Sequence, residues 1–136
     1  MPAGSTMTTA NLDQSVLDAL ARDGVTQIDI TTTGRKSGEP HRIEIVFHNI
    51  DGHIYISGMP GFKRSYMANL GADPHFTFHL KGPVTADLAA TARIISDEAE
   101  RRAVLAGVAR NWGRTDLDVM VEQSPLFEVT IEGRAG

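Results

Sequence analysis

Apolar and polar residues alternate along several stretches of this 136-residue chain, and the alternation constrains its fold more than any other feature. In residues 75–80, for example, Phe76, Phe78 and Leu80 occupy every second position. Successive side chains of a β-strand point to opposite faces, so this pattern predicts strands with one face in a core. Six strands are predicted, over residues 27–33, 41–50, 53–57, 75–80, 84–95 and 126–132.

The same alternation assigns strand residues to the two faces of the sheet. The core face is expected to hold Ile43, Ile45, Phe47, Ile54, Ile56, Leu88, Ala90, Ala92 and Ile94. The opposite, partly exposed face is expected to hold Arg42, Glu44, Val46, His48, His53, Tyr55, Ser57, His75, Thr77 and His79.

Turn and helix signals separate the predicted strands. Asp51-Gly52 predicts a tight hairpin turn, and the segment 34–38 predicts a second turn. Apolar residues at helical spacing predict helices over residues 12–20, 62–70, 97–113 and 115–123. The expected N-caps are Asn11 and Ser96, and the expected stop signals are Gly24 and Gly113.

The order of these elements favours an antiparallel arrangement. Strands and helices do not alternate as βαβ units, and no GxGxxG follows a strand, which argues against a Rossmann fold. We therefore predict a mainly β (α+β) protein, a small six-stranded antiparallel β-barrel with flanking helices. Residues 11–136 are expected to form one domain, preceded by a disordered arm over residues 1–10.

Several classes of protein and site are disfavoured. The chain has no cysteine, no GxSxG motif, and no apolar run near the ~20 residues that span a bilayer. Its start lacks the features of a signal peptide, so a cytoplasmic protein is expected. His75 and His79 are ~13 Å apart along a strand, and His48 and His53 have no obvious carboxylate partner, so no metal site is predicted.

Charge is distributed unevenly along the chain. The net charge is −4, yet residues 34–81 hold six Lys or Arg against four Asp or Glu, and all five histidines as well. A mildly basic segment of this kind suits a small anionic ligand, although chance scatter also explains it. It is too weakly basic for a nucleic-acid surface, so no nucleic-acid partner is expected.

Two glycine-rich loops in this basic segment are candidate anion sites. In segment 34–38, the glycines allow backbone N–H groups to converge beside Arg35, Lys36 and Ser37. In segment 57–65, a Gly/Pro loop leads into a helix whose first turn carries Lys63 and Arg64. An ordinary solvated turn and ordinary surface charge are the alternative interpretations.

Two stretches that contain these loops resemble the deazaflavin-dependent oxidoreductase family. The first, residues 28–45, includes Thr-Thr-Thr-Gly-Arg-Lys-Ser-Gly at 31–38, and the second, residues 57–74, includes Asn-Leu-Gly-Ala-Asp-Pro at 69–74. These proteins are nitroreductase-like split β-barrels that use 8-hydroxy-5-deazaflavin (coenzyme F-420), and they are related to the pyridoxamine-phosphate oxidase flavin barrels. The resemblance implies a split barrel, a homodimer, and hydride transfer from reduced F-420 to a small organic acceptor.

The resemblance also implies roles for particular residues. Phosphate would be held by Arg35, Lys36, Ser37, Gly38 and Arg42. The ring would be lined by Glu44, Ile45 and Val46 and flanked by Ser57, Gly58 and Met59, while Lys63, Arg64 and Ser65 would meet the phosphate or the acidic tail. Tyr66 is the candidate proton donor.

The sequence departs from the family at two places. Many members carry Trp-Tyr before the Asn-Leu stretch, whereas this chain has Ser65-Tyr66-Met67, and no tyrosine follows Tyr66. Nitroreductase-type members bring C-terminal tyrosines into the substrate pocket, so nitroimidazole reduction is disfavoured. FMN as the cofactor, and a non-catalytic cofactor- or lipid-binding role, remain open alternatives. Trp112 is expected either to stack on a ring or to pack at the end of its helix.

Overall fold

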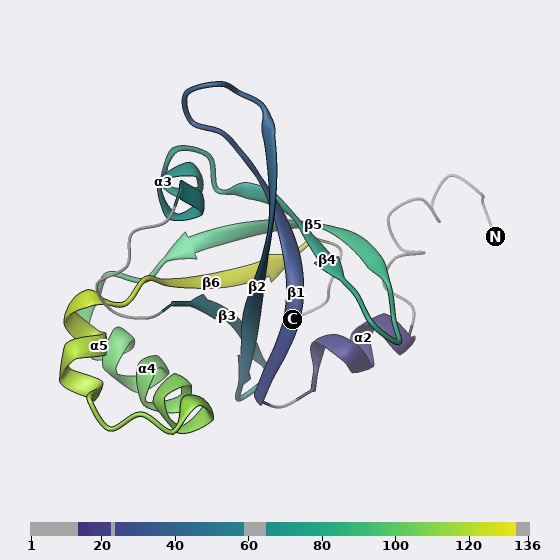
Figure 1. Ribbon diagram of the computed structural model, residues 1–136. Helices are drawn as coiled ribbons and strands as arrows, with labels where there is room; N and C mark the ends of the chain where they lie inside the picture. Colours follow the sequence, from purple (N-terminus) through teal and green to yellow (C-terminus); the bar gives the residue numbers. More distant parts are fainter. Residues whose placement is uncertain (1–13, 23, 59–64, 133–136) are drawn as a thin grey trace.

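A computed structural model describes residues 14–22, 24–58 and 65–132, and within them six antiparallel strands close into a barrel (Figure 1). The order around the barrel is β1-β2-β3-β6-β5-β4. The strands are β1 (Gly24–Thr33), β2 (Pro40–Ile50), β3 (His53–Ser57), β4 (His75–Leu80), β5 (Ala86–Ile94) and β6 (Leu126–Ile131). The predicted fold class, a mainly β barrel with flanking helices, is confirmed.

Alternating apolar residues fill the inside of the barrel. Ile28 and Ile30 of β1 are fully buried, and the rings of Phe47 and Phe78 meet with their centroids 5.3 Å apart. The Asp51-Gly52 turn has positive φ at both residues, as the tight hairpin between β2 and β3 requires. The period-2 pattern therefore predicted the core side correctly for Phe47 of β2 and for Phe76, Phe78 and Leu80 of β4.

The described residues include four helices, which lie outside the barrel in Figure 1. They are α2 (Gln14–Leu20), α3 (Ser65–Ala72), α4 (Glu98–Trp112) and α5 (Leu117–Gln123). Helices α4 and α5 form a second apolar cluster with the outside of the barrel, which includes Tyr55, Ile95, Val104, Leu105, Val108 and Met120. No helix in the described part of the chain is long and apolar enough to cross a membrane.

The burial of several outer-face side chains corrects the prediction of a partly exposed outer face. His48 is 0% exposed, and Tyr55 and Ser57 are also buried. His79 is buried too, with its Nε2 2.7 Å from Thr31 Oγ1 and its Nδ1 2.7 Å from Asp87 Oδ1. Strand alternation separates two faces, but it does not reveal which parts of the outer face another element covers.

A glycine allows α4 to lie close to β2. A Cβ built on Gly107 would lie 2.8 Å from Cδ1 of Ile50, closer than side-chain carbons approach. Helix α4 ends as predicted at Gly113, whose φ of 66° lets its N–H reach the carbonyls of Ala109 and Arg110. The approach brings the C-terminal end of α4 against the barrel.

Three local predictions are wrong. The N-cap of α4 is Asp97, which accepts a hydrogen bond from the N–H of Glu100, and not Ser96. Gly24 opens β1 with a φ of 89°, and does not directly end α2. Ile94 is 53% exposed while the next residue, Ile95, is buried, because the chain leaves β5 there and the alternation shifts by one residue.

Candidate functional site

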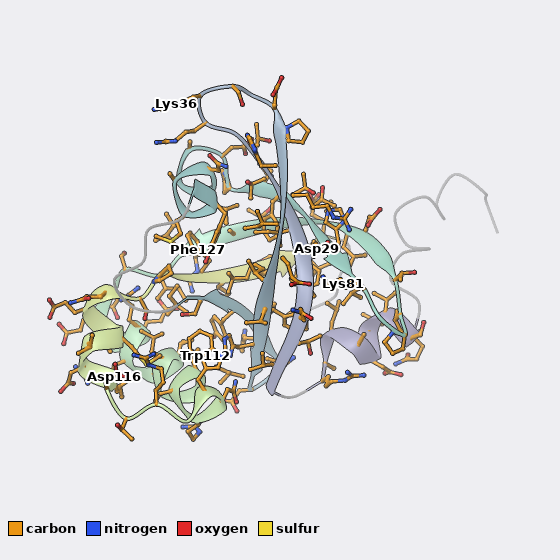
Figure 2. All side chains as sticks on the ribbon, viewed as in Figure 1. Asp29, Lys36, Lys81, Trp112, Asp116 and Phe127 are labelled. Carbon is orange, nitrogen blue, oxygen red and sulfur yellow. The ribbon has the colours of Figure 1, made fainter. Side chains whose placement is uncertain are left out.

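The hairpin of β1 and β2 projects beyond the barrel and ends in the turn 34–38, with Lys36 at its tip (Figure 2). The N–H of Gly34 donates to the carbonyl of Glu39 at 2.8 Å, and the N–H of Gly38 donates to the carbonyl of Gly34 at 2.8 Å. A Cβ on Gly34 would lie 2.7 Å from both His41 Nε2 and Ser37 Oγ. A side chain at position 34 would have to displace the ends of His41 and Ser37, so the turn is tight and its polar groups converge.

Asn69 of α3 ties this turn to the helix. Its Nδ2 donates to Thr32 Oγ1 at 3.1 Å, and its Oδ1 accepts from the backbone N–H of Arg35 at 3.1 Å. Asn69 and Thr32 are both buried. The two stretches that carry the family resemblance, 28–45 and 57–74, are therefore in direct contact.

Replacing Asn69 by alanine is expected to lower the free energy of unfolding by about 2 kcal/mol, because buried Thr32 and the N–H of Arg35 lose their partner. Urea denaturation measures the change. The matched control is Gln123→Ala, which truncates an exposed amide on α5 and is expected to leave stability unchanged within about 0.5 kcal/mol. Equal effects from the two substitutions would contradict the bridging role of Asn69.

A cavity of about 310 Å³, which we call the turn cavity, opens between this turn and α3. Its lining residues are Thr32, Gly34, Arg35, Lys36, Ser37, His41, Ile43, Tyr66 and Asn69. Two cations and no carboxylate belong to this lining. Among the residues that the structure describes, neither Arg35 nor Lys36 forms an ion pair, so both charges are available to an anion.

A second cavity of about 250 Å³, the barrel-edge cavity, adjoins the first at Tyr66. It is lined by Gln27, Glu44, Ile45, Val46, Ser57, Gly58, Tyr66 and Trp112. Pairing between β2 and β3 starts only at Phe47, opposite Ile56, so the earlier part of β2 has β1 on one side and these cavities on the other. The two cavities follow this edge of β2 and share the Tyr66 side chain.

Most of the residues predicted for the site meet along this edge. The structure brings together Arg35, Lys36, Ser37, Glu44, Ile45, Val46, Ser57, Gly58 and Tyr66. Gly38 shapes the turn with a φ of 72° but lines neither cavity. Met59, Lys63 and Arg64 lie outside the described residues, as does the side chain of Ser65, the residue that opens α3.

Arg42, like Gly38, is a predicted site residue that lines neither cavity. Its Nε donates to Asp29 Oδ2 at 3.0 Å, and Lys81 Nζ donates to Asp29 Oδ1 at 2.8 Å. Lys81, followed by Arg42, lowers the pKa of Asp29. Lys81 also pairs with Glu44, so both cations neutralise carboxylates on the outer face of the sheet.

Outside the turn 34–38, six lining residues had no assigned site role, namely Gln27, Thr32, His41, Ile43, Asn69 and Trp112, although stacking on a ring was one of two expectations for Trp112. A signal existed for His41, because strand alternation places it on the same face of the strand as Ile43 and Ile45. Arg42 lies on the opposite face. Asn69 belongs to the second resembling stretch, although no role was predicted for it. Nothing near Trp112 in the sequence links it to β2.

Ser57 and Gly58 form the wall of the barrel-edge cavity nearest to Pro125. The hydroxyl of Ser57 donates to the carbonyl oxygen of Pro125 at 2.8 Å, so its proton is engaged within the protein. A Cβ on Gly58 would lie 3.0 Å from Cγ of Pro125 and 3.6 Å from the Tyr66 hydroxyl oxygen. The Tyr66 hydroxyl is therefore next to this wall. No cluster of three potential metal-ligating side chains occurs among the described residues.

Comparison with known families decides what class of protein contains this site. The model of the F420H2-dependent quinone reductases matches residues 10–125, which is most of the chain. The chain belongs to this family. F420H2 is the reduced form of F-420, so this member of the quinone reductase family is an F-420-dependent oxidoreductase. The family resemblance inferred from residues 28–45 and 57–74 is thereby confirmed.

Solved structures share the fold of this family member. It superimposes on a conserved hypothetical protein of Mycobacterium tuberculosis with a TM-score of 0.65 and 20% identity, covering 88% of this chain and 80% of that one. A structure described as an F420-H2 dependent reductase superimposes with a TM-score of 0.58 and 21% identity, covering 76% of this chain and 93% of that one. A putative pyridoxamine 5'-phosphate oxidase from Listeria innocua superimposes with a TM-score of 0.61 and 15% identity, covering 89% of this chain and 94% of that one. A search of curated proteins finds no significant match.

The residues of this quinone reductase family member fit the chemistry of F-420. The turn cavity would offer Arg35 and Lys36 to the phosphate and acidic tail. The barrel-edge cavity offers apolar and aromatic walls suited to a flat ring. The two cavities meet at Tyr66, which matches a ligand with an anionic part joined to a planar part.

Proposed function

We propose that this protein transfers a hydride from F420H2 to a small quinone, with the anionic part of the cofactor in the turn cavity and its ring in the barrel-edge cavity. The observation that carries the proposal is the junction of a cationic and an aromatic cavity at Tyr66. Membership of the F420H2-dependent quinone reductase family supports the acceptor class.

Different residues would contribute binding and orientation. Arg35, Lys36 and Ser37 would hold phosphate through charge-assisted hydrogen bonds, with His41 beside them. Ile45 and Val46 would press on the ring from the free edge of β2. The protein thus orients the cofactor and excludes water, while F420H2 supplies the hydride when bound.

Reduction of a quinone to a hydroquinone takes one hydride and one proton. The hydride brings both electrons, so the protein has only to deliver a proton to the quinone oxygen. Tyr66 is the proposed donor, because its side chain is buried and borders both cavities. A general acid so placed accelerates such a step by about 10²-fold or more.

The test is anaerobic turnover of F420H2 with the naphthoquinone menadione. Wild-type protein is expected to oxidise F420H2 only when menadione is present. Tyr66→Phe, which removes the hydroxyl alone, is expected to lower kcat about 10²-fold and leave the Kd for F-420 unchanged. Turnover that Tyr66→Phe leaves intact would exclude the proton-donor role, and no turnover by wild type would exclude the proposed function.

A flavin is the second candidate cofactor. Its support is a structural neighbour described as a FAD-binding protein from Mesorhizobium loti, with a TM-score of 0.55 and 17% identity over 85% of this chain and 86% of that one. Competitive titration of FMN against F-420 separates the two.

We also propose a homodimer, since one neighbour is described as a domain-swapped dimer.

A further inference from the structure

Trp112 ends α4 and forms one wall of the barrel-edge cavity. It is the single tryptophan of the sequence. Figure 2 shows it between α4 and the barrel, and it shares the lining of the barrel-edge cavity with Val46 of β2. The helix stops one residue later at Gly113, so the indole sits where α4 ends.

The ring of His48 contacts the indole, and Asn111 contacts His48 in turn. The rings of His48 and Trp112 meet edge-on, with centroids 4.9 Å apart and an interplanar angle of 74°. Asn111, the residue before Trp112 on α4, has its Nδ2 3.1 Å from Nδ1 of His48 on β2. This contact links the end of the helix to the strand. The close approach at Gly107 and Ile50 brings α4 near enough for these contacts.

His48 occupies this position at a cost to stability. It is fully buried, and its Nε2 has no hydrogen-bond partner within the described structure. Burial lowers the pKa of His48 to about 4, so the ring is neutral at pH 7. An apolar side chain would avoid the unpaired polar atom, and Asn111 is exposed, so water would satisfy its amide. The fold alone gives no reason for histidine here.

We propose that Trp112 selects planar aromatic acceptors by stacking on their ring, and that His48 is the residue that positions the indole for this contact. Aromatic pairs prefer defined geometries, so an indole held by these contacts favours a naphthoquinone, which carries a fused aromatic ring, over a non-aromatic acceptor such as cyclohexenone. This inference rests on the proposed quinone reduction and deepens it by naming the residue that selects the acceptor.

The first experiment replaces Trp112 by leucine and compares menadione with cyclohexenone as acceptors. We expect KM for menadione to rise about tenfold and KM for cyclohexenone to change less than twofold, a difference that a general loss of F-420 binding would not produce. In the cofactor-free wild type, menadione is expected to quench the fluorescence of Trp112 saturably. Trp112→Phe, which keeps an aromatic ring, is expected to restore most of the preference for menadione.

The second experiment tests His48 through two substitutions. His48→Leu is expected to keep the free energy of unfolding at pH 7 at or above the wild-type value, yet to red-shift the Trp112 emission and raise KM for menadione. His48→Phe retains a ring for the edge-on contact, and is expected to give the wild-type emission of Trp112 and the wild-type KM for menadione. A merely structural histidine would lower stability and leave the acceptor preference unchanged.

The outcomes separate this inference from the proposed function. If menadione is reduced but Trp112→Leu leaves both KM values unchanged, or menadione does not quench saturably, Trp112 does not select the acceptor. If His48→Leu leaves emission and KM at wild-type values, His48 does not position the indole. If F420H2 reduces neither acceptor while menadione still quenches saturably, the proposed function fails and the stacking contact stands.

Discussion

Replacing both Arg35 and Lys36 by alanine is expected to weaken F-420 binding about 10²-fold, or about 3 kcal/mol. Both cations line the turn cavity, and no carboxylate shares that lining. Each substitution removes one charge-assisted hydrogen bond to phosphate. The loss of binding free energy per hydrogen bond lies at the lower end of the usual range, because both side chains are exposed. Fluorescence titration of F-420 measures the loss, which is expected to shrink at high salt.

Arg42→Ala is the matched control for this double substitution. The resemblance assigns Arg42 to the phosphate, whereas the structure pairs it with Asp29 outside both cavities. Its removal is expected to change the Kd of F-420 less than twofold and to lower stability by no more than about 1 kcal/mol. A loss from Arg42→Ala as large as that from the double substitution would overturn the position of the anion site.

Acidification from pH 7 to pH 4 is expected to lower the free energy of unfolding by about 3 kcal/mol through His48 alone. Burial lowers the pKa of His48 from 6.5 to about 4 in the folded protein. As the pH falls through 6.5, the unfolded chain therefore binds a proton that the folded chain still rejects. The contribution of His48 is complete above pH 6.5 and is lost between pH 6.5 and pH 4.

Urea denaturation at pH 7, 5.5 and 4 measures this dependence against His48→Leu. The variant lacks the titrating group, whereas carboxylates with lowered pKa, such as Asp29 and Asp116, are present in both proteins. The difference between the two stability curves thus isolates His48. Parallel curves would mean that water reaches the imidazole in the folded state.

Strand alternation predicted the barrel because period 2 is a property of the local backbone. Phe76, Phe78 and Leu80 follow it and are buried, and so is Phe47 in β2. Turn signals were equally local, since Asp51-Gly52 and the turn 34–38 depend on backbone conformations that few residues adopt. The predicted bounds of the strands and helices therefore agree with the observed bounds within a few residues.

The candidate site was predicted in part. Arg35 and Lys36 were found because basic residues and glycines coincide in one turn. The family resemblance assigned Arg42 to the phosphate, yet the strand turns Arg42 to the outer face, where Asp29 binds it, and brings His41 to the cavity. Face assignment by alternation carries more information here than residue charge.

By itself, the sequence determined the strands, the tight turns, the cationic loop and the family, because each depends on neighbouring residues in the chain. Tertiary structure alone decided which outer surfaces are covered. His48 and Trp112 are 64 positions apart in the chain and meet only because α4 packs on β2, with Gly107 against Ile50. No local pattern encodes that contact, since packing depends on the shapes of distant surfaces. The aromatic wall of the barrel-edge cavity thus follows from the fold.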